Sequence, residues 1–171
     1  MELTKELIVA LSKEAKRIEE DANYSGKSHL NAASIWSKRH YWLGVPATVA
    51  GAFAGAAIVK EYQALAGLLT LATTLLTGLV TFLKPYERAA QHKSVGDQFL
   101  ELRNDARVFY EIEVLENEDK ASLSESLKTL ASRRNDLNKG SPEFPRKAFE
   151  DARKGIEEGE SNHAVDLIDK K

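Results

Sequence analysis

Six polar residues recur along one side of an otherwise apolar segment, and they are the residues of this chain best suited to chemistry. They are Gln63, Thr70, Thr74, Thr77, Thr81 and Lys84. At about 100° per residue they form a narrow stripe if the segment is helical. From its first residue to its last the stripe spans roughly 31 Å at helical rise, about the thickness of a bilayer's hydrocarbon core. Such a line of amide and hydroxyl groups can coordinate water and ions, as the lining of a pore does.

The same threonines also have a simpler interpretation. A helical threonine often donates its hydroxyl to its own i−4 carbonyl, and in membranes it often packs against a neighbouring helix. Two helices cannot enclose a channel, so a pore requires several copies of the chain around an axis. The stripe alone leaves pore lining and helix packing open.

The remaining chemistry-bearing residues do not form a recognisable catalytic or metal-binding pattern. The four histidines, His29, His40, His92 and His163, lack partners at ligand spacing, and cysteine is absent. Asp97, Glu101 and Asp105 follow one another at helical spacing, which is typical of a solvated face. No phosphate-binding glycine motif or nucleophile motif occurs. We therefore expect no catalytic residue, no cofactor and no enzyme activity.

The charge distribution places the stripe within a helical hairpin. Charged residues make up 29% of the chain, yet between Leu43 and Leu83 only Lys60 and Glu61 are ionisable. The uncharged run 43–59 is close to the lower limit for crossing a bilayer, the run 62–83 is long enough to cross it, and the two charges between them allow only a tight turn. The pattern predicts two antiparallel transmembrane helices; a hairpin buried in a soluble bundle is the alternative.

Small residues on the first of these helices predict close packing. Gly44, Ala47, Gly51 and Gly55 share one side, and Gly51 and Gly55 form a GxxxG motif. Small residues let helix backbones approach each other within a membrane.

Basic residues set the expected orientation. Lys38 and Arg39 precede the hairpin, whereas Lys84, Arg88 and Lys93 follow it. The positive-inside tendency then places both termini in the cytoplasm, with the chain crossing the cell (inner) membrane twice. Aromatic residues expected at the membrane interfaces flank both spans: Trp36, Tyr41, Trp42, Tyr62, Phe82 and Tyr86.

The flanking segments are predicted to be cytoplasmic amphipathic helices, so the expected fold is all-α, a single domain over residues 1–171. Residues 1–42 form its N-terminal part, 43–83 the hairpin and 84–171 the C-terminal part. Residues 23–27 (Asn-Tyr-Ser-Gly-Lys) are expected to interrupt or bend the first helix, and one long helix is expected over 87–116. A net charge of −2 favours no nucleic acid partner.

A pattern of spaced residues runs through nearly the whole chain. Before the first span it comprises Arg17-Ile18, Asp21-Ala22, Tyr24-Ser25, Lys27, His29, Asn31-Ala32-Ala33, Trp36, His40 and Leu43-Gly44-Val45-Pro46. After the second span it comprises Lys84-Pro85, Ala89-Ala90-Gln91-His92, Gly96-Asp97-Gln98-Phe99, Leu102 and Arg107. Near the end it comprises Ser141-Pro142, Pro145, Ala148-Phe149, Ala152-Arg153, Ile156 and Gly159-Glu160. In this order the pattern resembles the SLATT domain.

The SLATT family comprises two-transmembrane effectors associated with bacterial nucleotide signalling and anti-phage conflict systems. The resemblance implies a homo-oligomeric, pore-forming effector that permeabilises the host cell's own membrane during abortive infection. It also implies an activating signal from a separate nucleotide-generating or nucleotide-sensing protein. The alternative function is a non-conducting membrane scaffold whose cytoplasmic helices recruit a partner enzyme.

Overall fold

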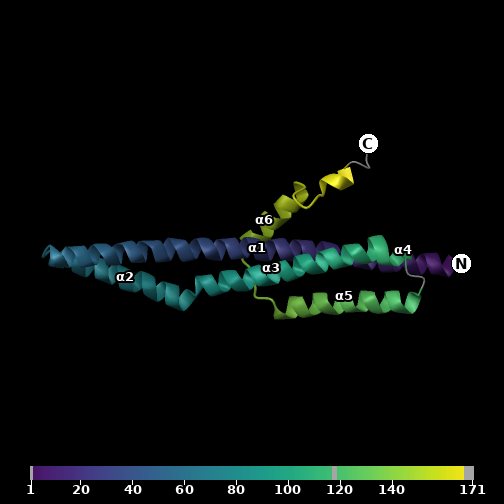
Figure 1. The fold of residues 1–171 in the computed structure, drawn as a ribbon, viewed down its shortest axis with the longest axis horizontal. Coiled ribbons are helices and arrows are strands. Elements are labelled where there is room, and N and C mark those ends of the chain that lie inside the picture. The colour runs from purple at the N-terminus through teal and green to yellow at the C-terminus, as the bar shows by residue number, and fades with distance from the viewer. Residues whose placement is uncertain (1, 117–118, 168–171) are drawn as a thin grey trace. The chain divides into compact units, whose positions relative to one another are not determined.

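The chain is all-helical, as the sequence predicts. The structure, a computed structural model, describes residues 2–116 and 119–167 and the side chains of residues 5–116 and 119–165, and it contains no strand within those ranges. Its elements are α1 (Glu2–Val59), α2 (Gln63–Leu83), α3 (Pro85–Val108), a π-helical turn (Phe109–Glu113), α4 (Val114–Glu116), α5 (Lys120–Gly140), α6 (Arg146–Glu157) and a 3₁₀ turn (Ala164–Leu167) (Figure 1).

The helices group into two compact units. The first contains residues up to Ala32 together with those from His92 onward, and the second contains Ala33–Gln91. Helices α1 and α3 each contribute residues to both. The second unit therefore consists of the predicted hairpin with nearly three turns of helix before it and about two after it.

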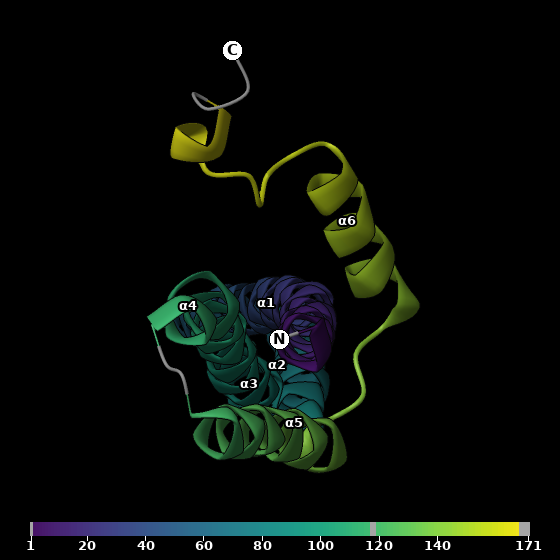
Figure 2. The ribbon, with the colours of Figure 1, turned by 90° about the vertical axis from the view of Figure 1, so that its right-hand side faces the viewer.

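The core of the first unit lies among α1, α3 and α5, which lie next to one another in the end-on view (Figure 2). Ile18 and Ala22 of α1 are fully buried against α3, whose core residues are Phe99, Leu102 and Ala106. Partly buried leucines of α5 cover this cluster: Leu127, Leu130 and Leu137. Burial of these apolar side chains is the main term that holds the three helices together.

Helix α6 is held on α1 by polar contacts. The Asn31 side-chain amide donates to the Ala148 carbonyl at 3.2 Å, and the Lys27 ammonium lies 3.1 Å from a Glu160 carboxylate oxygen. The small residues Ala148, Ala152 and Gly155 form the buried side of α6. The C-terminal segment thus belongs to the first unit.

Helix α1 continues through residues 23–27, so the expected interruption there is wrong. Gly26 does not break the helix, and it lies where α3 approaches closely. A Cβ added at Gly26 would lie 3.1 Å from Leu100, and one added at Gly96 would lie 2.9 Å from Leu30 and 3.1 Å from the Gly26 carbonyl. The packing gained from this approach outweighs the roughly 1 kcal/mol cost of a helical glycine.

The long helix expected over 87–116 is also modified. It begins at Pro85, and its hydrogen bonds change to the π pattern over Phe109–Glu113. The extra residue in this turn orients Phe109 into a core cluster with Leu11, Ala15 and Leu123. The neighbouring Tyr110 hydroxyl donates to Glu19 at 2.9 Å. Short π segments of this kind re-aim side chains within a helix.

The second unit is an antiparallel hairpin of two helices that are long and apolar enough to cross a membrane, by length and composition. Only 17% of the apolar window in the first and 6% of that in the second are buried within the chain. The turn comprises Lys60–Tyr62, where Glu61 adopts a left-handed conformation (φ 60°) and the Tyr62 amide donates to the Ala57 carbonyl. The described part of the chain therefore does not enclose the hairpin as a soluble core would.

Candidate functional site

The contact between α1 and α2 is built from small side chains. Ala47, Ala54 and Ala57 of α1 are buried under α2, and Ala66 of α2 is buried under α1. Leu69, Ala72, Thr73 and Leu76 of α2 are partly covered along the same line. This spacing of three and four residues determines which side of each helix the hairpin covers and which sides stay open.

Two of the four predicted packing residues meet α2. Ala47 is buried, and a Cβ added at Gly51 would lie 3.6 Å from the Thr73 methyl group. Gly44 and Gly55 have no neighbouring atom within 4 Å of an added Cβ. The four small residues predicted to pack together are therefore divided: Ala47 and Gly51 contact α2, whereas Gly44 and Gly55 lie beyond the edge of that contact.

The predicted stripe residues of α2 lie outside its contact with α1. Gln63, Thr70, Thr74, Thr77 and Thr81 are all exposed. The Thr74 hydroxyl donates to the Thr70 carbonyl, and the Thr81 hydroxyl donates to the Thr77 carbonyl, both at 2.9 Å. Each hydroxyl hydrogen is thus used within the helix, while the oxygen keeps lone pairs that can accept from water or contact a cation.

Lys84 departs from the stripe. Helix α2 ends at Leu83, and Lys84 caps it in a left-handed conformation (φ 45°) before α3 begins. Its ammonium lies 3.3 Å from the Glu87 carboxylate, and both side chains are exposed. The position of Lys84 is set by the junction between two helices and not by the helical period that places the threonines.

The glycines of α1 beside the contact and the threonine stripe of α2 lie on the same side of the hairpin. Viewed from the turn, the right-handed α1 winds counterclockwise as it approaches, and the antiparallel α2 winds clockwise as it recedes. Residues about a quarter turn past the contact line therefore reach the same side on both helices. The contact between Gly51 and Thr73 lies at the edge of that side. We call it the small polar side: Gly44, Thr48, Gly51, Gly55, Thr70, Thr74, Thr77 and Thr81.

Another side of the hairpin carries large apolar residues. We call it the large apolar side, and each of its residues is exposed: Val45, Val49, Phe53, Leu68, Leu71, Leu75, Leu79 and Phe82. The hairpin thus has two chemically different sides, each formed by both helices. A surface divided in this way can face lipid on one side and other protein or water on the other.

The sequence analysis missed a pair of histidines in the first unit. His29 of α1 and His92 of α3 are only 2% and 3% exposed, and their Nδ1 atoms lie 2.9 Å apart. The His29 ring stacks on Phe99 and meets the edge of Phe144. Burial, and secondly the nearby His92, lowers the pKa of His29 to about 4. Since 63 residues separate the two histidines, sequence spacing gave no signal of this pair.

A polar hollow of about 480 Å³ lies elsewhere in the first unit, between α1, α3, the π turn and the segment after α6. Its lining carries three cations (Lys16, Arg103 and Arg107) and three carboxylates (Glu19, Glu20 and Glu111). Burial, and then the hydrogen bond to Glu19, raises the pKa of Tyr110 at its edge. Balanced charges give this hollow no preference for an ionic ligand.

Across the described residues no group of three or more His, Asp or Glu side chains is arranged to hold a metal ion. Comparisons of the chain with protein-family models, with curated proteins and with solved structures gave no match.

Proposed function

We propose that this chain is a membrane protein whose hairpin assembles, in several copies around an axis, into a gated pore in the cell (inner) membrane. One observation supports the proposal above the others: the small polar side is formed jointly by both helices, its threonines and Gly55 are exposed, and it lies opposite the large apolar side. In a bilayer the apolar side would face lipid. The small polar side would then face neighbouring copies and water.

Membrane insertion is supported by the exposed leucines, valines and phenylalanines of the hairpin. Left in water, they would form an apolar surface far larger than a soluble monomer usually exposes. The basic residues at the open end favour the orientation with both termini in the cytoplasm. The hairpin is helical on both sides of its turn, so its backbone hydrogen bonds lie mostly within each helix, as a lipid environment demands.

Pore lining is supported by the chemistry of the small polar side. Gly44 and Gly55 leave room for the helix of another copy to approach closely. The Thr74 and Thr81 hydroxyls donate back into their own helix, so their oxygens, with those of Thr70 and Thr77, offer acceptors along about half of the bilayer's thickness. A ring of such helices would present uncharged oxygens to water and to cations.

The resemblance to the SLATT domain supports the biological part of the proposal. The pore would stay closed until a separate nucleotide-generating or nucleotide-sensing protein signals infection. The signal would act on the first unit and shift a closed-to-open equilibrium among subunits. Opening would permeabilise the host membrane and stop phage propagation.

Dye release from liposomes tests the proposal. The purified protein is reconstituted and assayed with and without candidate signalling nucleotides. Replacing two stripe residues together, Thr74→Leu with Thr77→Leu, should reduce leakage tenfold or more, because the change removes the acceptors in the middle of the stripe. The matched control, Leu75→Val with Leu79→Val on the large apolar side, should leak like the original protein.

Membrane insertion is measured separately by flotation of the liposomes. A double leucine variant that inserts and still leaks at the original rate would exclude a threonine-lined path. A protein that does not float with liposomes at all would exclude the membrane proposal itself.

A second candidate function is a membrane scaffold for a cytoplasmic partner. Val108, Ile112 and Leu115 are exposed and follow one another at nearly helical spacing on the first unit. An apolar line of this kind suits the groove of another protein. For a scaffold, replacing the hairpin with an unrelated two-helix anchor should preserve activity in cells, whereas the same replacement should abolish the activity of a pore.

A further inference from the structure

At the open end of the hairpin two guanidinium groups lie over one tryptophan. The Arg39 guanidinium carbon lies 4.5 Å from the centre of the Trp36 ring, and that of Arg88 lies 4.8 Å from it. Trp36 is only 9% exposed, whereas both arginines are exposed. Cation–π contacts at this range hold a guanidinium in place while its N–H groups stay available.

These two arginines have no ionic partner in the described part of the chain. No carboxylate oxygen lies within 4.0 Å of either guanidinium there. The adjacent Lys84 is paired with Glu87, which is the one acidic residue at this end of the second unit. Together with Lys38, this end of the second unit carries four basic residues and one acidic residue. Two guanidinium groups that contact one ring and have no carboxylate partner offer N–H donors to an anion with two or more acceptor oxygens.

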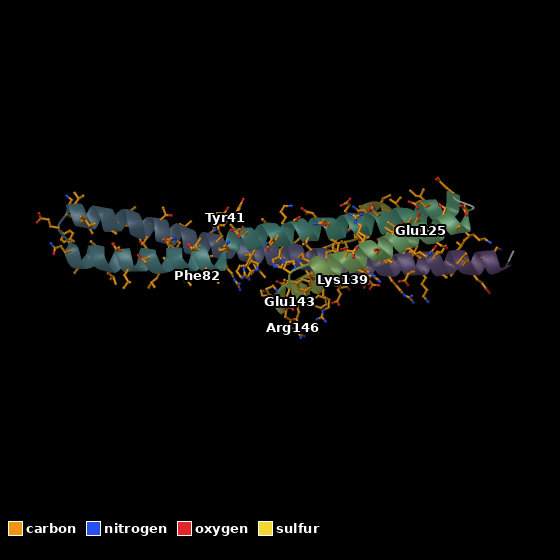
Figure 3. All side chains as sticks on the ribbon, turned by 90° about the horizontal axis from the view of Figure 1, so that it is seen from below. Tyr41, Phe82, Glu125, Lys139, Glu143 and Arg146 are labelled. Carbon is orange, nitrogen blue, oxygen red and sulfur yellow. The ribbon has the colours of Figure 1, made fainter. Side chains whose placement is uncertain are left out.

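The surroundings of this site favour a lipid anion over a soluble one. Tyr41, Trp42, Phe82 and Tyr86 are all exposed at the same end, and Trp42 and Phe82 are 78% and 87% exposed. Tyr41 and Phe82 project from the two helices at the end opposite the turn (Figure 3). Aromatic side chains concentrate at the depth of lipid headgroups, so the site lies where a phosphodiester would be found.

One polar atom at this end lacks a hydrogen-bond partner. The Nδ1 atom of His40 is buried and makes no hydrogen bond among the described residues. Its ring lies 5.7 Å from the rings of both Tyr41 and Tyr86. An unsatisfied buried nitrogen costs free energy. A ligand or water that enters this layer of side chains would recover part of that cost.

We propose that Trp36, Arg39 and Arg88 form a binding site for the phosphodiester of an anionic phospholipid on the cytoplasmic leaflet. Each guanidinium donates N–H groups to phosphate oxygens, and the Trp36 ring holds both in position. The inference rests on the membrane placement proposed above but does not depend on pore formation. A scaffold anchored by the same hairpin would carry the same site.

Lipid retention tests the site directly. The full chain is placed in nanodiscs of phosphatidylcholine mixed with phosphatidylglycerol, extracted in mild detergent and weighed by native mass spectrometry. The original protein should retain phosphatidylglycerol preferentially. Arg39→Gln with Arg88→Gln should reduce that preference about tenfold or more, since each juxtamembrane cation contributes roughly 1 kcal/mol near an anionic surface.

Two control variants separate a built site from general charge. Arg146→Gln with Arg153→Gln removes the same charge from α6, where both arginines are paired with glutamates, and should leave the preference unchanged. Arg39→Lys with Arg88→Lys keeps the charge but loses planar, bidentate donors. Its preference should disappear at raised salt, whereas that of the original protein should persist.

Several outcomes would overturn the inference. They are an unchanged preference in the double glutamine variant, an equal loss in the α6 control, or full displacement of the lipid by soluble glycerophosphoglycerol, which would indicate a site for free phosphate esters. The single variants Arg39→Gln and Arg88→Gln serve if the double variant misfolds, as judged by circular dichroism. Flotation is measured alongside, so failure to insert is distinguished from insertion without lipid preference.

Discussion

His29 and His92 are in contact in the core of the first unit. Their two Nδ1 atoms can share a single proton without placing two charges side by side. A second proton would place two like charges 2.9 Å apart among Phe99 and Phe144. Burial already lowers the pKa of His29 from 6.5 to about 4. Between those pH values His29 binds a proton in the unfolded chain but not in the folded chain. The histidine pair is therefore a point at which acid weakens the first unit.

We predict that the free energy of unfolding falls as pH is lowered from about 6.5 to about 4. The loss due to His29 should approach 3 kcal/mol, at 1.36 kcal/mol per unit of pKa difference. Urea unfolding of the full chain in detergent, followed by circular dichroism, measures it. His29→Asn should flatten the dependence in this range, whereas the exposed His163→Asn should not. Identical slopes in the original protein and His29→Asn would contradict the prediction.

The close approach of Gly26 and Gly96 leads to a second prediction at this scale. In Gly96→Ala the new methyl group would meet Leu30 and the Gly26 carbonyl, so α1 and α3 must separate. We expect a loss of about 1–3 kcal/mol in the free energy of unfolding, in spite of alanine's better helix propensity. Gly140→Ala, where an added Cβ has open space, is the control and should be neutral or stabilising. Thermal unfolding distinguishes the two.

At the scale of whole elements, the helices were predictable because apolar periodicity and charge placement are local signals. The turn was expected at Lys60-Glu61 and lies at Lys60–Tyr62. The continuity of α1 through Gly26 was not predictable, because its cause lies on α3. The rotation of α2 was not predictable either. Thr73 is partly buried against α1 and Thr74 is exposed, since the packing of the buried alanines of the two helices decides the rotation.

The contact with α2 includes Ala54 but not its neighbour Gly55, so substitutions at these two residues should affect different contacts. Ala54 is buried under α2, so Ala54→Leu should separate the hairpin helices. Gly55 faces open space, so Gly55→Leu should leave the hairpin intact but weaken association between copies. Because the chain has no native cysteine, Gly51→Cys with Thr73→Cys provides a disulfide reporter of the hairpin contact. Its yield should fall with Ala54→Leu only, and chemical cross-linking between copies should fall with Gly55→Leu. The opposite pattern would place the intermolecular contact elsewhere.

At the scale of the whole molecule, the two-sided hairpin limits how copies can assemble. If the small polar sides of two copies met face to face, the assembly would close as a dimer with no lumen. A ring requires that each hairpin contact its neighbours at the edges of the small polar side and leave the middle to water. Glycines concentrate on α1 and threonines on α2, so contact and lumen can be assigned to different helices. If copies assemble as proposed, this division places α2 innermost in the pore.

Accessibility of single cysteines to a charged thiol reagent tests that arrangement in liposomes. Thr74→Cys and Thr77→Cys lie on the small polar side, whereas Leu71→Cys and Leu75→Cys lie at similar depth on the large apolar side. With α2 innermost, the activated protein should react quickly at 74 and 77 and at least tenfold more slowly at 71 and 75, because thiolates form poorly in lipid. Modification at 74 or 77 should also change leakage, since it adds charge to the lumen. Equal reaction rates at all four positions would show that water reaches both sides of α2, and the chain would then not form a pore lined by its threonines.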